Sequence, residues 1–241
     1  MQHPKRIELV KVDRSKIPFS CKEEDALLCP DVLAALYDLK KEIEKNKGTL
    51  KINSFFRTWA KQQSLVDLHN KDVEANKKDP SKPITHAYAA PPGNSFHMAG
   101  RAIDVDLHSL NFQGEAKTDW LKKLWDLAIP LGFNAIISKP DMNISEAWHF
   151  DHRGAWKIVC DKIGTKEAVK CSILDVGNWD PNEDIEKVKN RFIQAELIKL
   201  GRYELAKPDG IIGNMTKKAL KDIVNVDVLN TGQLVEILKN I

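Results

Sequence analysis

The sequence lacks any long apolar run. No segment approaches the roughly 18 consecutive apolar residues of a bilayer-spanning helix, and residues 1–8 contain no apolar stretch of the kind found in a secretory signal. We therefore expect no membrane partner. We also expect a protein that is cytoplasmic until it is released, or one whose signal has already been removed.

The net charge is also small, and cysteines are few. The 37 Lys and Arg residues nearly balance the 34 Asp and Glu residues, which leaves a formal net charge of +3. Proteins that bind nucleic acid usually carry a clustered basic face, so we expect no nucleic-acid partner, whereas mild basicity is compatible with an anionic polymer. The four cysteines contain no CxxC pair, which argues against a cysteine-ligated zinc site. They are predicted to be interior or free thiols, and one or two disulfides remain the alternative.

Hydrophobic periodicity predicts an α+β fold, a small mixed or antiparallel sheet with flanking helices. Asp31 is a candidate N-cap for the first helix, Gly48 is its expected stop, and Thr58 opens the second helix. A proline-rich loop over residues 77–96 is a candidate rim for a binding cleft. The expected helices cover 31–47, 58–76 and 118–131, and the expected strands cover 49–56, 99–107, 133–138 and 148–150.

A polar, turn-rich stretch at residues 175–184 predicts a linker between two domains, residues 1–174 and residues 185–241. The second domain has helical periodicity that is interrupted by a glycine-rich turn, so we expect a small three-helix domain. One of its helices should end at Gly201, and Thr216 should cap the next one.

Three side chains form a candidate metal-ligand set in the first domain. His97 ends the proline-rich loop, Asp104 lies in the strand that follows, and His149 comes later in the chain. Two imidazoles and one carboxylate suit a single catalytic zinc ion, which keeps a fourth position open for water. Such a metal makes water more nucleophilic and polarises a carbonyl. Glu146, three residues before His149, is placed to act as a general base without being a ligand.

Each of these residues has an ordinary interpretation when considered alone. A histidine is more often a core or surface side chain than a ligand, Asp104 could be a solvated carboxylate at a strand end, and Glu146 could be a charge near a turn. The prediction therefore depends on the combination. The histidines outside this set are expected at the surface or behind the ligands: His3, His69, His86, His108 and His152. Among them, His152 is the alternative ligand, because it lies three residues after His149.

The same segments resemble a known family. Residues 95–104 follow the pattern SxHxxGxAxD, and residues 146–149 follow ExWH. These patterns resemble the VanY-type zinc D-Ala-D-Ala carboxypeptidases, the related dipeptidases of vancomycin resistance and the phage L-alanyl-D-glutamate endolysins. The resemblance implies zinc ligation by His97, Asp104 and His149, with Glu146 as the catalytic base.

The resemblance also implies three residues that contact the substrate. Ser95 and Trp148 match conserved positions of the two patterns, and Arg57 follows a strand upstream of the first ligand. Arg57 would hold a substrate carboxylate or the developing oxyanion, since a guanidinium suits either group. The alternative for Arg57 is a structural ion pair.

The C-terminal segment resembles the three-helix peptidoglycan-binding domains. It contains the patterns IQxxLxxLG, DGxxGxxT and AL within residues 193–220. The resemblance implies binding to bacterial peptidoglycan, which would tether an enzyme to its substrate. A three-helix module for another partner remains the alternative, because a fold does not determine a function.

These resemblances together predict a zinc-dependent peptidase that hydrolyses the stem peptides of peptidoglycan and acts at the cell wall as a monomer. A lytic endopeptidase of the endolysin type is the first expectation, and a D-alanyl-D-alanine carboxypeptidase is the alternative within the family. A non-catalytic zinc-containing protein that binds the wall is the alternative from another class. Glu146 favours an enzyme, because a protein that only binds has no use for a general base.

Overall fold

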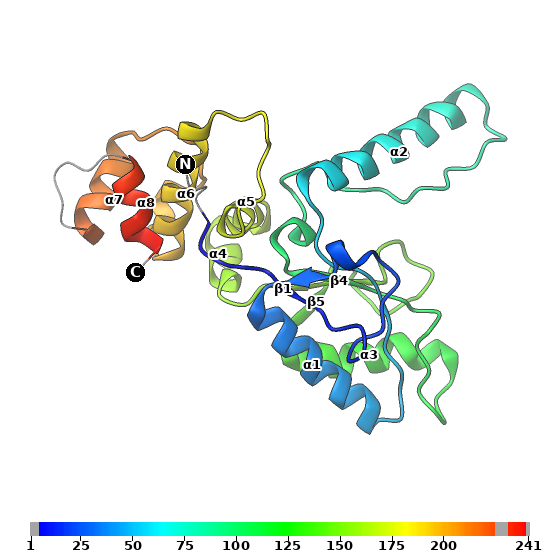
Figure 1. Ribbon diagram of the computed structural model, residues 1–241. Helices are drawn as coiled ribbons and strands as arrows, with labels where there is room; N and C mark the ends of the chain where they lie inside the picture. The colour runs from blue at the N-terminus through cyan, green and yellow to red at the C-terminus, as the bar shows by residue number, and fades with distance from the viewer. Residues whose placement is uncertain (1–4, 225–230, 240–241) are drawn as a thin grey trace. The chain divides into compact units, whose positions relative to one another are not determined.

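The computed structural model describes residues 5–224 and 231–239. It divides into two compact units. We call residues 9–91 and 96–154 the mixed unit, and residues 5–8, 92–95, 155–224 and 231–239 the helical unit. Strands occur in the mixed unit (Figure 1), so the α+β class is confirmed. None of the helices in the described ranges is long and apolar enough to cross a bilayer.

The mixed unit is built around an antiparallel sheet. In the described residues, its four strands have the spatial order β3-β4-β6-β5, and β1 pairs with β2 in a separate ribbon. The strands are β1 (Val10–Lys11), β2 (Leu27–Leu28), β3 (Ile52–Ser54), β4 (Ala102–Val105), β5 (Phe133–Ala135) and β6 (His149–His152). The α-helices and short 3-10 helices are η1 (Glu23–Asp25), α1 (Pro30–Lys45), α2 (Trp59–Lys78), η2 (Phe96–Ala99), η3 (Lys117–Asp119), α3 (Trp120–Ala128) and η4 (Ile129–Leu131).

Helix α1 buries its apolar side as predicted, but it begins differently. Cys29 is the N-cap residue and Pro30 opens the first turn. The Asp31 carboxylate does not cap the helix, because it binds the Arg101 guanidinium at 2.8 and 3.2 Å. Arg101 is almost fully buried, so this ion pair ties the start of α1 to β4. The buried residues of α1 are Val32, Leu36, Leu39 and Ile43.

The end of α1 shows why Gly48 is a glycine. The left-handed residue after the helix is Lys47, with φ +55°, and not the glycine. A Cβ atom at Gly48 would lie 2.5 Å from the Phe112 ring and 2.8 Å from the Ile43 side chain. Gly48 therefore permits the close packing of Phe112 against the helix.

Helix α2 and the segment that follows it form an arm, residues 59–91. Figure 1 shows α2 reaching outward and the chain running back along it. Thr58 caps α2 as predicted, because its hydroxyl accepts a hydrogen bond from the Lys61 backbone N–H (3.2 Å). The expected apolar side of α2 is not a core face, since Gln62 is the residue that is fully buried. The apolar side chains expected there are half-buried or exposed: Trp59, Leu65, Val66 and Leu68.

The helical unit consists of helices that pack on one another. Helices α4 and α5 contact each other and α6, so they group with the C-terminal helices. The domain boundary that we propose at residue 174 depends on the polar composition of residues 175–184. The elements are α4 (Trp156–Ile163), α5 (Thr165–Asp175), α6 (Ile185–Lys199), η5 (Tyr203–Leu205), α7 (Asn214–Val224) and α8 (Thr231–Lys239).

A buried glutamine organises the turn between α6 and α7. The Gln194 side-chain oxygen accepts from the Gly210 N–H (2.7 Å), and its amide donates to the Asp209 carboxylate (2.9 Å) and to the Ile211 carbonyl (3.1 Å). Gly210 has φ +84°, and a Cβ there would lie 2.7 Å from a side chain of α6. The predicted cap Thr216 is instead buried within the first turn of α7, with its hydroxyl 3.4 Å from Gln194 Nε2.

Glu196, a fully buried residue of α6, lies close to a second carboxyl group, that of Asp175. Arg6 donates to Glu196 at 2.5 Å, and Lys199 donates to the neighbouring Asp175 at 2.7 Å. Burial is the main effect that raises the pKa of Glu196 to about 8, with Asp175 adding to it and Lys199 and Arg6 opposing it. Glu196 therefore holds a proton in the folded protein over a pH range in which it is ionised in the unfolded chain.

The stability of the helical unit should accordingly fall as pH rises from about 4.5 to about 8. In this window the folded state binds more protons than the unfolded state, so the free energy of unfolding decreases with pH. The loss is on the order of a few kcal/mol, since one pKa unit corresponds to about 1.4 kcal/mol. Urea unfolding across this window should show a flatter pH dependence for Glu196→Gln than for the wild type. Equal pH dependences in the two proteins would contradict this explanation.

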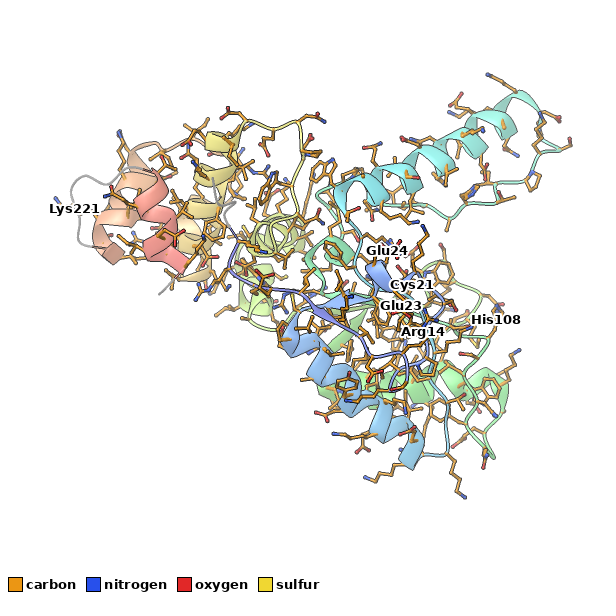
Figure 2. All side chains as sticks on the ribbon, in the orientation of Figure 1. Arg14, Cys21, Glu23, Glu24, His108 and Lys221 are labelled. Atoms are coloured by element: carbon orange, nitrogen blue, oxygen red, sulfur yellow. The ribbon has the colours of Figure 1, made fainter. Side chains whose placement is uncertain are left out.

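All four cysteines lie in the described residues and are thiols, not disulfides, as predicted. Cys29, Cys160 and Cys171 are buried, and Cys21 is half-buried. Figure 2 shows Cys21 near Arg14 and Glu23, and Arg14 donates to the carbonyl of Cys21 (3.2 Å) and to the carboxylate of Glu23 (2.7 Å).

Candidate metal centre

The three predicted ligands meet in the mixed unit. Asp104 on β4 and His149 on β6 are direct partners across an antiparallel pair, which places their Cβ atoms about 4.5–5.5 Å apart. His97 comes from η2, just before β4, and its ring centroid lies 4.9 Å from that of His149. Among the described residues, these three are the group whose ligand atoms, all within 4.8 Å of one another, could hold a metal ion.

In each of the two imidazoles, the nitrogen that faces away from the other ligands makes a hydrogen bond. This leaves the lone pair of the other nitrogen directed at the point between the three ligands. His97 Nδ1 donates to the Phe55 carbonyl (2.5 Å), and His149 Nε2 donates to the Asp151 carboxylate (2.7 Å), since those oxygens can only accept. The inner atoms, His97 Nε2 and His149 Nδ1, lie 3.2 Å apart. They lie 3.0 and 3.1 Å from Asp104 Oδ1. Two acceptor nitrogens and a carboxylate oxygen around one buried point fit a zinc ion.

The charges of these side chains favour a cation at that point. Burial is the main effect that lowers the pKa of His97 to about 4. Burial also opposes charge on His149, but its hydrogen bonds to Asp104 and Asp151 outweigh this and raise its pKa to about 10. Burial acts to raise the pKa of Asp104, yet His97, His149 and Arg57 together hold it well below its usual range. A proton on His149 thus balances the carboxylates, and a bound cation would replace that proton.

Arg57 lies after β3 and binds the outer oxygen of Asp104. Its guanidinium donates to Asp104 Oδ2 (2.5 Å) and its Nε donates to the Ser54 hydroxyl (3.2 Å). The Arg57 side chain is 18% exposed. The ion pair considered as an alternative is therefore present, and it leaves Asp104 Oδ1 facing the two histidines. It also places the guanidinium beside the candidate ligand set.

Glu146 occupies a strained backbone position just before β6. Its φ is +67°, a left-handed value that is uncommon for a residue with a side chain. Its carbonyl accepts from the His149 N–H (3.0 Å), which forms the tight turn into the strand. Its side chain is half-buried, and burial raises the pKa of this carboxyl group. Strain and a raised pKa beside a ligand set are typical of a functional residue.

A cleft of about 910 Å³ lies beside Asp104 and Trp148. Its wall is formed by residues 104–108, 117–118 and 139–143, together with Asn53 and Trp148. His108, labelled in Figure 2, belongs to this wall. The volume is within the usual range for a ligand site, and Trp148 lines it, but its contact with a substrate remains a prediction. Ser95 directly precedes η2, and its contact with substrate remains a prediction.

A family model for D-alanyl-D-alanine carboxypeptidase, VanY, matches residues 25–155. The match covers more than half of the 241 residues and contains all of the candidate site residues. The chain belongs to the VanY family. Together with the ligand set, this membership makes the chain a zinc metallopeptidase. No curated protein matches the sequence.

Solved structures related to the VanY-family chain are distant. Each of three is 20% identical to it: a zinc complex of a variant of the vancomycin-resistance D,D-pentapeptidase VanY, VanYB in complex with D-alanine-D-alanine, and the LdcB LD-carboxypeptidase. They cover 69%, 70% and 70% of this chain and 84%, 84% and 78% of their own, with TM-scores of 0.43, 0.42 and 0.44. The family assignment depends on the family model.

His152 lies outside the ligand group, in line with the first expectation and not with the alternative that it is a ligand. Residues 149 and 152 are three apart in β6, so their side chains face opposite sides of the strand, and the His152 ring packs on Phe133 (centroids 5.1 Å apart). Asp151 was not predicted, although residues 149 and 151 of one strand share a face and the sequence thus contained the signal. His69 and His86 lie on the arm, and His3 lies outside the described residues.

Proposed function

We propose that the chain hydrolyses a peptide bond in the stem peptides of bacterial peptidoglycan, with one zinc ion held by His97, Asp104 and His149. The observation that carries this proposal is the convergence of three buried donor atoms in a VanY-family chain. Glu146, at a strained position before β6, supports an enzyme over a protein that only binds the wall.

The residues around the donor set have distinct roles in this mechanism. When bound, zinc polarises the scissile carbonyl and makes water more nucleophilic. Glu146 takes a proton from the attacking water and returns it to the nitrogen of the leaving amine. Arg57 holds a substrate carboxylate or the oxyanion with its guanidinium. Trp148 and Ser95 contact the peptide.

The family description favours the terminal D-Ala-D-Ala bond, and hence a carboxypeptidase, as the first candidate. The second candidate is a lytic endopeptidase of the endolysin type. One observation favours it, the cleft of about 910 Å³, which has room for several residues of a peptide chain. Both candidates act at the cell wall, and in both the chain works as a monomer.

We also propose that residues 185–241 bind peptidoglycan. Gln194 and the Asp209-Gly210 turn form the hydrogen-bonded centre of this helical region. Binding to an insoluble polymer would raise the local concentration of stem peptides without changing the chemistry.

A stem peptide ending in D-Ala-D-Ala, supplied as the free acid and as the C-terminal amide, tests the bond and the role of Arg57. A carboxypeptidase should release D-Ala from the acid and prefer it over the amide. Arg57→Ala should lower the preference for the acid over the amide by about 10- to 100-fold, since hydrogen bonds to charged groups contribute about 1.5–3 kcal/mol. Cleavage of an internal bond in both peptides would support the endopeptidase instead. No cleavage of either by zinc-loaded protein would contradict both candidates.

A further inference from the structure

The two candidate histidine ligands are held in different ways. The outer nitrogen of His97 binds a neutral backbone carbonyl, that of Phe55. The outer nitrogen of His149 binds a charged side chain, with Asp151 Oδ1 2.7 Å from His149 Nε2. Only the second partner depends on the identity of a side chain.

Asp151 is rigidly placed for this contact. It lies on β6, two residues after His149, so both side chains leave the same face of the strand. Its backbone is paired on both sides, with Ala102 of β4 and Asn134 of β5. The side chain is 5% exposed, and Arg153 approaches the other carboxylate oxygen at 3.8 Å. The paired backbone therefore fixes the position of Asp151 beside His149, and burial leaves its carboxylate little contact with solvent.

Asp151 does not contribute a ligand atom itself. It contacts the outer nitrogen of His149, whereas the inner nitrogen, Nδ1, faces His97 and Asp104 Oδ1. By accepting from Nε2–H, Asp151 selects the tautomer whose lone pair is on Nδ1. A carboxylate in this position also makes the imidazole a stronger donor to a metal.

We propose that Asp151 is a positioning residue that sets the metal affinity of the site through His149. The proposal depends on the metal site and not on which peptide bond is cut. Loss of an outer hydrogen-bond partner of a ligand typically weakens metal binding by about 10- to 100-fold. Asp151→Ala should weaken zinc binding by that factor. Asp151→Asn keeps an acceptor oxygen but loses the charge, so its affinity should be intermediate.

The test is the zinc dissociation constant of the full chain, measured by competition with a chromophoric chelator. Asp31→Asn is the matched control, because it removes a carboxylate that binds Arg101 and touches neither histidine. Thermal unfolding of chelator-treated protein shows whether each variant folds. The visible absorption of the cobalt-substituted proteins reports the ligand geometry, which a purely structural role of Asp151 would leave unchanged.

We expect zinc affinity to fall in the order wild type, Asp151→Asn, Asp151→Ala, with Asp31→Asn equal to wild type and an altered cobalt spectrum in Asp151→Ala. Wild-type affinity and spectrum in a folded Asp151→Ala would overturn the proposal. If Asp151→Ala does not fold, the test uses Asp151→Asn. A zinc dissociation constant of Asp151→Asn equal to that of the wild type would then overturn the proposal. None of these measurements depends on hydrolysis. If the zinc affinities follow the expected order but the protein cleaves no peptide, the role of Asp151 stands and the proposed function is rejected.

Discussion

Replacing Glu146 by glutamine should lower kcat for stem-peptide hydrolysis by about 10²- to 10⁴-fold, the usual contribution of a general base. Glutamine keeps the size of the side chain but cannot take a proton from water. Zinc content should stay at the wild-type level, because Glu146 is not in the ligand group. The measurement is steady-state hydrolysis together with metal analysis of the same sample.

The pH profile gives an independent check on Glu146. Hydrolysis by the wild type should fall on the acid side as this carboxyl is protonated, and burial places that fall above the usual value of 4.5. The variant should lack this limb. Glu23→Gln is the control, since it makes the same chemical change at an exposed residue paired with Arg14. A kcat within a few-fold of wild type in Glu146→Gln would mean that another group is the base.

Replacing Asp104 by asparagine should weaken zinc binding by more than about 100-fold and abolish hydrolysis. Loss of an outer partner costs up to about 100-fold, and loss of a ligand costs more. The change also removes the charge that faces Arg57 and both histidines. Equilibrium dialysis against zinc measures the first effect directly.

Asp106→Asn is a matched control for Asp104→Asn. Asp106 lies two residues along the chain, but its carboxylate accepts from the backbone N–H groups of His108 and Ser109 (3.2 and 3.3 Å) and not from the histidine rings. Zinc binding should survive this change. Zinc affinity equal to wild type in Asp104→Asn would remove Asp104 from the ligand set.

The ligand set could be predicted from sequence because its members occur at fixed spacings that a chance arrangement seldom reproduces. His97 and Asp104 are close in the chain, and the strand that carries Asp104 was visible as alternation of apolar residues. The direct pairing of Asp104 with His149 across β4 and β6 was not predictable. Pairing register depends on contacts between distant segments, which periodicity does not encode.

Other features failed for identifiable physical reasons. Asp31 has the chemistry of an N-cap, but a buried guanidinium competes for the same carboxylate. Residues 59–68 have apolar side chains at helical spacing, yet α2 belongs to an arm and packs few of them. A contact with a distant residue thus redirects Asp31, whereas α2 lacks the distant contacts that would bury its apolar side, and a local sequence pattern reports neither effect.

Digestion of purified peptidoglycan tests the central claim most directly. Zinc-loaded wild type, chelator-treated wild type and zinc-loaded Glu146→Gln would be compared, with mass spectrometry of the released products and the new termini. We predict that only zinc-loaded wild type releases products, and that these are free D-Ala or peptides with a single type of new terminus. Equal release by wild type and Glu146→Gln, or no release by zinc-loaded wild type from any peptidoglycan type, would contradict the assignment of this site as a zinc peptidase of the cell wall.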